Sequence, residues 1–176
     1  MGSVPEVKSG LVRWIGSVVD LSLADQHEIA ELVKAGGAIQ ASVEAILPRL
    51  RQTKMLALLR EEEGGRIVGV GALKTPLPHY RKGRFTNAGA SLVGFEGAPE
   101  LGYVVVHSAR RGQMLSGDLV EAIAGAINEP AFATTDSNTM RNNLARSGFR
   151  RVGTDWQGSK GDLSLWVIDP GSSPSL

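Results

Sequence analysis

The chain has 176 residues, of which 42% are hydrophobic and 21% are charged, and its formal net charge is +1. This length suits one domain with a hydrophobic core, and a charge so near to neutral argues against a surface built mainly to bind nucleic acid. The sequence contains no cysteine, which excludes disulfides, thiolate metal ligands and a cysteine nucleophile, and favours a cytoplasmic location.

Both ends of the chain are expected to lie outside the domain, which we place at residues 12–168. Residues 1–11 lack the basic and then apolar layout of a signal peptide and are interpreted as an N-terminal extension. Residues 169–176 are rich in Ser, Pro and Gly and are predicted to form a flexible tail. Because no apolar stretch is long enough to cross a bilayer, we expect no membrane contact.

The domain is predicted to begin with a strand and a helix. Residues 12–21 offer the apolar bulk of a strand. Either Ser22 or Asp25 can cap the helix that follows, since their side-chain oxygens accept hydrogen bonds from the first helical amides. The glycines at 36–37 are expected to end this helix.

A second helix and two strands are predicted next. Helical spacing of apolar residues covers residues 40–52, where Pro48 is expected to weaken or kink the helix. Residues 55–62 and 66–73 read as strands joined by a turn at residues 63–65.

A long connection without clear periodicity follows at residues 75–99. It is rich in Pro and Gly and contains a basic cluster of Arg81, Lys82 and Arg84. Long loops in compact domains are often functional, so this segment either covers a substrate or is a solvated excursion. The sequence leaves both interpretations open.

The most informative stretch is a strand, a basic turn and a helix. Glu100 precedes the apolar run 101–106, a basic turn containing glycine occupies 110–113, and an amphipathic pattern covers 115–127. The first amides of a helix have no partner within the helix, and the helix dipole adds positive potential there. The turn therefore suits an anionic ligand, above all a phosphate. An ordinary connection with solvated arginines is the alternative.

The C-terminal part repeats a strand-to-helix unit and ends in two strands. Residues 131–135 read as a strand, and the polar residues 136–138 can cap a helix that runs to about Arg146. Residues 149–156 and 163–168 are predicted to pair as strands. Two strand-to-helix units after an antiparallel region predict an α/β fold with a parallel portion in the centre of the sheet.

From about residue 12 to 168, this order of elements resembles the GNAT superfamily of acetyl-CoA-dependent N-acetyltransferases. The family's pyrophosphate loop has the pattern Gln/Arg-x-x-Gly-x-Gly/Ala, and Arg111–Ser116 stands in its place. The later run through Gly148 and Phe149 is similar to the family's Gly-Phe strand entry. The resemblance implies a single α/β domain whose mixed, mostly antiparallel sheet has a central splayed parallel pair and about four flanking helices.

Ser116, a small residue in place of Gly or Ala, departs mildly from the family's pattern, and two further positions depart more strongly. Met114 stands where the family usually has a glycine that lets the backbone approach the pyrophosphate. Leu144 stands where many members carry a tyrosine that protonates the departing thiolate. Both departures favour an alternative, in which the protein binds an acyl-CoA or a protein partner without efficient acetyl transfer.

The resemblance implies that a primary amine attacks the thioester of acetyl-CoA directly. Glu100 is our choice for the general base, with Tyr103 as a second catalytic candidate. The remaining candidates are expected to contact the cofactor: Val104, Val105, Val106, Arg110, Arg111, Gly112, Gln113, Met114, Leu115, Ser116, Gly117 and Asn138.

The acceptor is expected to be a small-molecule or peptide amine, and a homodimer is left open. Histidines far apart in the sequence and the lack of cysteine predict no metal site. Arg141, Arg146, Arg150 and Arg151 can form a basic stripe, but such a stripe on a near-neutral protein is usually a solvated face, so we do not expect a nucleic-acid partner.

Overall fold

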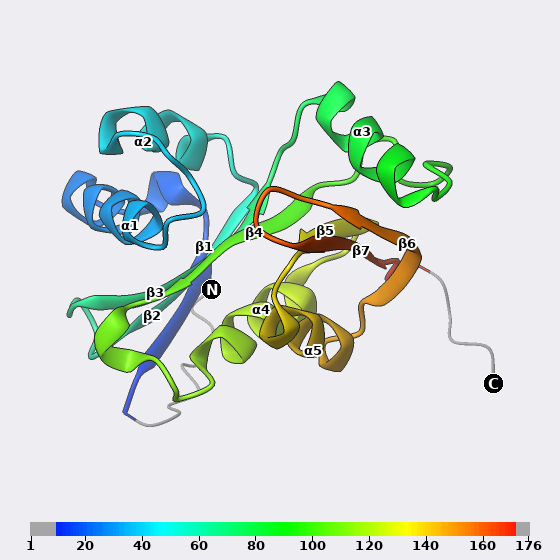
Figure 1. Cartoon of the computed structure of the whole chain (residues 1–176). Coiled ribbons are helices and arrows are strands. Elements are labelled where there is room, and N and C mark those ends of the chain that lie inside the picture. The colour runs from blue at the N-terminus through cyan, green and yellow to red at the C-terminus, as the bar shows by residue number, and fades with distance from the viewer. Residues whose placement is uncertain (1–9, 172–176) are drawn as a thin grey trace.

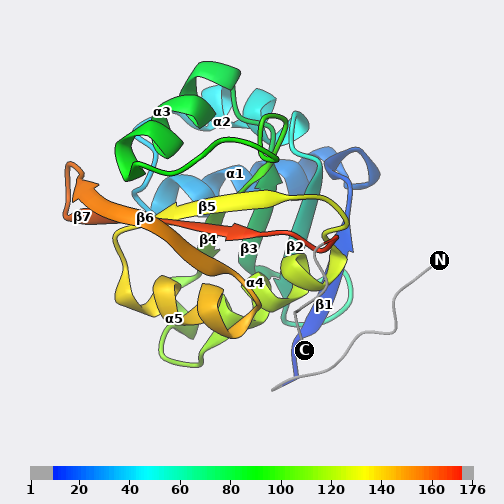
Figure 2. The same cartoon turned by 90° about the vertical axis from the view of Figure 1, so that its right-hand side faces the viewer.

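The computed structural model describes residues 10–171, which form a seven-stranded sheet with helices on both faces (Figure 1, Figure 2). The strand order is β1-β2-β3-β4-β5-β7-β6, and β4 and β5 are the parallel neighbours in an otherwise antiparallel sheet. The predicted fold class is confirmed. The strands are β1 (Val12–Gly16), β2 (Met55–Arg60), β3 (Ile67–Lys74), β4 (Glu100–Val106), β5 (Ala131–Thr135), β6 (Arg150–Gln157) and β7 (Asp162–Ile168). The α-helices are α1 (Leu23–Ala35), α2 (Val43–Arg51), α3 (Pro78–Ala88), α4 (Leu115–Ala126) and α5 (Asn138–Arg146).

The helices divide between the two faces of the sheet. On one face α1 and α2 pack against β2 and β3, and α3 packs against β5 and β7, where the rings of Phe85 and Phe132 meet at 5.5 Å between centroids. On the other face lie α4 and α5 (Figure 2). Strand β4 runs between the region covered by α1 and α2 and the region covered by α3 (Figure 1).

Serine side chains fix the starts of three helices. Ser22 Oγ accepts a hydrogen bond of 3.1 Å from the amide of Asp25, so of the two predicted caps Ser22 is the one that acts. Ser42 caps α2 and Ser137 caps α5 in the same way. Each bond satisfies one amide that the helix leaves without a partner. The second helix continues through Pro48 to its end at Arg51.

Two predicted elements differ from the structure. The first strand is shorter than residues 12–21, because it ends at Gly16 and a 3-10 turn follows at Val18–Asp20. Within residues 10–171 there are five α-helices, one more than expected, because α3 lies in the segment predicted as an irregular connection.

The helix α3 was not predicted, because its sequence carries few of the signals that identify a helix. It begins with Pro78 and has no side-chain cap, and its buried face consists of Phe85, Ala88 and the charged Arg81. The guanidinium of Arg81 is buried and donates to the carbonyl oxygens of Ala98 and Pro76, at 2.8 and 3.3 Å. An arginine that supplies a helix's inner face breaks the apolar periodicity on which sequence prediction depends.

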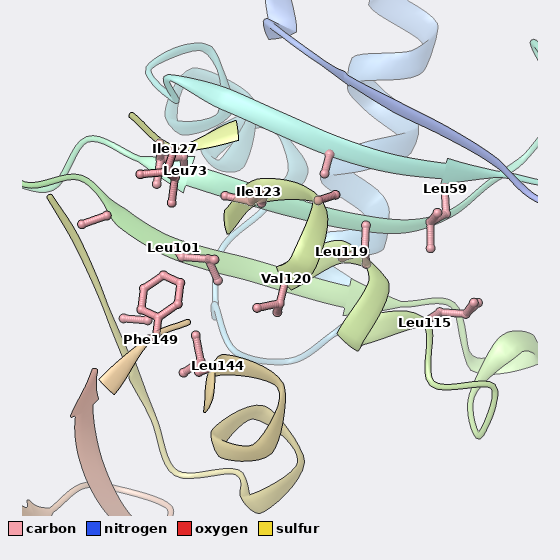
Figure 3. Packing of buried hydrophobic residues seen from close by; sticks show 14 of the residues in the cluster. Leu59, Leu73, Leu101, Leu115, Leu119, Val120, Ile123, Ile127, Leu144 and Phe149 are labelled. Atoms are coloured by element: carbon pink, nitrogen blue, oxygen red, sulfur yellow. The ribbon is translucent and has the colours of Figure 1, made fainter. Parts of the chain in front are cut away.

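The helix α4 lies close to the sheet at two glycines of β3. A Cβ atom on Gly69 would come within 3.1 Å of Leu119 Cδ1, and one on Gly71 within 3.1 Å of Ile123 Cδ1. Figure 3 shows Leu119 and Ile123 of α4 pointing toward these strands. The small residues of β3 therefore let α4 approach the sheet, which fixes the position of the helix's first turn.

We expect Gly153→Ala to lower the free energy of unfolding by about 2–4 kcal/mol, measured by urea denaturation. Gly153 of β6 has a φ of +67°, and a Cβ atom there would overlap the carbonyl oxygen of Ala88 at the end of α3. The control is Gly89→Ala, since Gly89 has a φ of +66° and a Cβ atom there would meet nothing within 4 Å. The control should cost about 1 kcal/mol from backbone strain alone. Equal losses in both variants would contradict the proposed contact.

The limits predicted for the domain fall at the edges of the described residues. Leu11 is 2% exposed and packs in the core, while residues 1–9 and 172–176, which hold most of the predicted extension and tail, lie outside them. None of the helices in residues 10–171 has the length and apolar character needed to cross a membrane.

Candidate functional site

The two parallel strands separate soon after they meet. Glu100 of β4 and Phe132 of β5 form the one pair in register between these strands. On the other side of β4, the pairing with β3 shifts between Val70 and Ala72, and Tyr103 adopts a φ of +52°. An irregularity of this kind is a β-bulge, which bends a strand and increases its twist. The bulge therefore turns β4 away from β5 and opens a slot between them.

A positively charged turn joins the end of β4 to α4. The chain forms a 3-10 turn at Ser108–Arg110, passes Gly112 with a φ of +81°, and enters the helix after Met114. A cavity of about 450 Å³ lies over this turn. Its lining consists of Gly36, Val104, Val105, Val106, Arg110, Arg111, Gly112, Met114, Leu115, Ser116 and Thr139.

A second cavity of about 500 Å³ continues into the slot. It is lined by residues of β4 from Leu101 to Val104, by β5 and by the start of α5. Both cavities share Gly36, Val104, Ser116 and Thr139, so they form one groove from the turn to the bulge. Above the slot, Lys160 Nζ donates to the carbonyl oxygen of Gly37 at 3.3 Å, which links the β6–β7 loop to the segment after α1.

Several solved structures with the same arrangement are named as acyltransferases. A GNAT-family acetyltransferase from Streptococcus agalactiae aligns with a TM-score of 0.65 and 10% identity, over 92% of this chain and 97% of that chain. An acyl-CoA N-acyltransferase from Pseudomonas aeruginosa aligns with a TM-score of 0.62 and 15% identity, over 89% and 98%. A ribosomal-protein-S5-alanine acetyltransferase from Vibrio fischeri gives 0.62 and 14%, over 98% and 100%.

The chain has the GNAT fold. The resemblance noted in the sequence is thus confirmed at the level of architecture. No family model matches the sequence, and no curated protein matches it either.

The groove collects most of the predicted site residues. In the GNAT fold of this chain, Tyr103 lines the slot, and nine of the predicted cofactor contacts line the cavity over the turn. Gln113, Gly117 and Asn138 do not line either cavity. Asn138 Oδ1 accepts from Arg141 Nη1 at 2.7 Å, and the next residue, Thr139, faces the groove instead.

Met114 adopts the backbone conformation that its position requires of any residue. Its φ is +60°, in the left-handed region, and its side chain is 68% exposed. A glycine would adopt this conformation without strain, whereas methionine there costs about 1–2 kcal/mol. Met114 also lines the cavity over the turn, and most of its side chain faces solvent.

Leu144 belongs to the hydrophobic core. Its side chain is fully buried and lies beside Phe149 and Val120 (Figure 3). A leucine there has no proton to give and no access to the slot. The position that carries a tyrosine in many GNAT members therefore supplies packing in this chain.

Glu100 lies at the start of β4 in a buried polar cluster. Its side chain is 4% exposed, Oε1 accepts from Lys74 Nζ at 2.8 Å, and Oε2 accepts from Tyr80 Oη at 3.1 Å. The Lys74 ammonium also lies 4.6 Å from the ring centre of Tyr103, which lines the slot. Glu100 itself lines neither cavity, so the cluster touches the groove through Tyr103.

The cluster holds two protons more tightly than free side chains do. Burial lowers the pKa of Lys74, but attraction to the Glu100 carboxylate and the hydrogen bond with it outweigh burial, so this pKa lies above its usual 10.5. Burial and the neighbouring Glu100 carboxylate raise the pKa of the Tyr80 phenol above 10.0. Both groups therefore favour the folded state as long as they are protonated.

We expect the free energy of unfolding to fall as the pH rises above about 10, in urea denaturation between pH 8 and 11.5. The unfolded chain loses these two protons first, so each added pH unit favours unfolding until the folded-state pKa values are passed. Tyr80→Phe should make the decline shallower. Lys54→Met is the control, because the ion pair of Lys54 with Glu129 is exposed at 44% and 39%. A decline unchanged by Tyr80→Phe would contradict the role of the cluster.

Several residues of the site were absent from the prediction. Lys74 follows directly after a predicted strand, and its pairing with Glu100 depends on a strand register that the sequence does not reveal. Tyr80 lies in the unpredicted helix α3. His107 accepts from the amide of Ala109 through Nδ1 at 3.1 Å, and lines a separate cavity beside α1. Among residues 10–171 no cluster of His, Asp or Glu could hold a metal ion.

Proposed function

We propose that the protein is an acetyl-CoA-dependent N-acetyltransferase that acts on a primary amine. The observation that carries this proposal is the groove that begins over the amides at the start of α4 and continues into the slot between β4 and β5. A helix start suits a diphosphate, and a strand edge without a neighbour suits a chain that contains amides. Acetyl-CoA contains a diphosphate followed by a chain with amides, in the same order as the helix start and the slot along the groove.

The residues of the turn fit a diphosphate. Gly112 lines the cavity without a side chain, and its open backbone lets an anion approach the amides from Gly112 to Gly117. Arg111 supplies positive charge at the same cavity, and Arg110 does so while it contacts Glu61 Oε1 at 3.4 Å. The backbone of Val104–Val106 is our proposed partner for the amides of the pantetheine arm.

Acetyl-CoA supplies an acyl carbon that an amine can attack. The new C–N bond forms as the C–S bond breaks, the amine's proton passes to a base, and the sulfur leaves as the thiolate of CoA, which takes up a proton from water. We assign the base to Glu100 and a supporting role to Tyr103. Lys74 and Tyr80 occupy the two oxygens of the Glu100 carboxylate. The proton of the amine therefore reaches Glu100 when a water molecule, or the amine itself, replaces one of these two hydrogen-bond partners.

The buried position of Leu144 favours a second candidate, a protein of this fold that binds acyl-CoA or a partner without efficient transfer. In such a protein the groove holds the cofactor but nothing replaces the missing tyrosine.

The acceptor is proposed to be a small-molecule or peptide amine, and a cytoplasmic location stays a prediction from the cysteine-free sequence.

Two measurements separate these candidates. Isothermal titration with acetyl-CoA tests binding, and an assay of thiol release against a panel of small amines and peptides tests transfer. Binding together with release that depends on the amine supports the transferase. Binding without release on any amine supports the second candidate, and no binding removes both acyl-CoA proposals.

A further inference from the structure

The side chain of Asn143 links α5 to the first turn of α4, and its orientation is fixed by its neighbours. Asn143 is 3% exposed and contacts Arg146 Nη2 at 3.1 Å on one side and Ser116 Oγ at 3.0 Å on the other. A guanidinium can only donate hydrogen bonds, so the atom facing Arg146 must be the amide oxygen. The amide nitrogen consequently faces Ser116 and donates to it.

This orientation determines where the proton of Ser116 goes. Since Ser116 Oγ accepts from Asn143 Nδ2, its own O–H is left to donate in another direction. Ser116 is the second residue of α4 and lines both cavities of the groove. The hydroxyl proton therefore has the groove as its available direction.

We propose that Ser116 donates a hydrogen bond to a phosphate oxygen of the bound ligand and that Asn143 is the positioning residue that turns its hydroxyl toward the groove. This inference rests on the proposed acetyl-CoA site and adds a side-chain donor to the backbone amides there. Hydrogen bonds to charged acceptors are stronger than those between neutral groups, so a phosphate gains more from this hydroxyl than a carbonyl does.

The surroundings of Asn143 hold this arrangement in place. A Cβ atom on Gly117 would lie 3.1 Å from Asn143 Oδ1, so the glycine lets α5 approach the first turn of α4. Within the buried network, Asn143 has its oxygen engaged by Arg146 and its nitrogen by Ser116. The amide is thus fixed before any ligand arrives, which limits the entropy lost when the ligand binds.

The first test compares two probes, CoA and pantetheine, which lacks the diphosphate. Ser116→Ala should weaken the binding of CoA about tenfold in isothermal titration. The affinity of pantetheine, measured by its competition with CoA, should stay unchanged. Ser91→Ala, on an exposed loop, is the control and should bind both as the parent does. Equal weakening for both probes overturns the phosphate contact. If the parent does not bind CoA, the proposed function fails with it, whereas CoA binding that Ser116→Ala leaves unchanged overturns this inference alone.

The second test reverses the direction of the hydrogen bond between residue 143 and the Ser116 hydroxyl. In Asn143→Asp the carboxylate still faces Arg146, but it accepts from Ser116 and turns the proton away from the groove. CoA affinity should fall about tenfold in the single variant and no further in the double variant with Ser116→Ala. Asn142→Asp, exposed on the same helix, corrects for the added negative charge. Additive losses after this correction would show that Asn143 acts on the groove independently of Ser116 and would overturn its role.

Discussion

Gly112→Asp is expected to abolish the binding of CoA in isothermal titration. Gly112 lines the cavity over the turn and has a φ of +81°. A carboxylate there would face the phosphates of the proposed ligand, and like charges at about 4 Å repel by several kcal/mol in a partly dry site. The side chain also occupies the space through which a diphosphate would reach the amides at the start of α4.

The control for this variant is Gly64→Asp. Gly64 lies in the turn between β2 and β3 with a φ of +72°, and a Cβ atom there would meet nothing within 4 Å, so it matches the backbone strain and the added charge. The control should bind CoA as the parent does, and both variants should lose similar stability in urea. Unchanged CoA binding by Gly112→Asp would place the diphosphate elsewhere.

Glu100→Gln is expected to lower amine-dependent thiol release by about a hundredfold or more, the usual loss when a general base is removed. The affinity for CoA should change little, because Glu100 lines neither cavity. The variant should also lose about 2–3 kcal/mol of unfolding free energy, since the amide leaves the partly buried Lys74 ammonium without its counter-charge.

An exposed ion pair provides the comparison. Glu129→Gln removes the partner of Lys54 where both side chains are well exposed, so it should cost less than about 1 kcal/mol and leave thiol release unchanged. Assays at 25 °C, after urea denaturation has shown that the variants are folded, separate catalysis from stability. Thiol release by Glu100→Gln at the parent's rate would assign the base to another group.

The strands and helices that carry local signals were predictable from sequence. Ser22, Ser42 and Ser137 cap helices as their residue type indicates, and the strand, turn and helix around residues 100–127 are where the pattern placed them. These features depend on neighbours within a few residues. The turn before α4 could therefore be located before any tertiary contact was known.

Features that depend on distant contacts could not be predicted in this way. The helix α3 is held by Arg81 through carbonyl oxygens of two other segments, and no local pattern reports such bonds. The bond between Asn143 and Ser116 joins residues 27 positions apart and requires the packing of α5 on α4. Lys74 faces Glu100 because of a strand register that the sequence left open.

The single residue pair between β4 and β5 makes the sheet discontinuous. Beyond Glu100 and Phe132, the backbone groups with which these two strands face each other have no ladder partner across the gap, so they are available for hydrogen bonds from water or a ligand. The two half-sheets are separated during folding, so ligand binding does not have to supply the free energy for separating them. An elongated molecule that contains amides can pair with the strand edges of this slot as an added strand would. It gains these hydrogen bonds without breaking any bond within the protein.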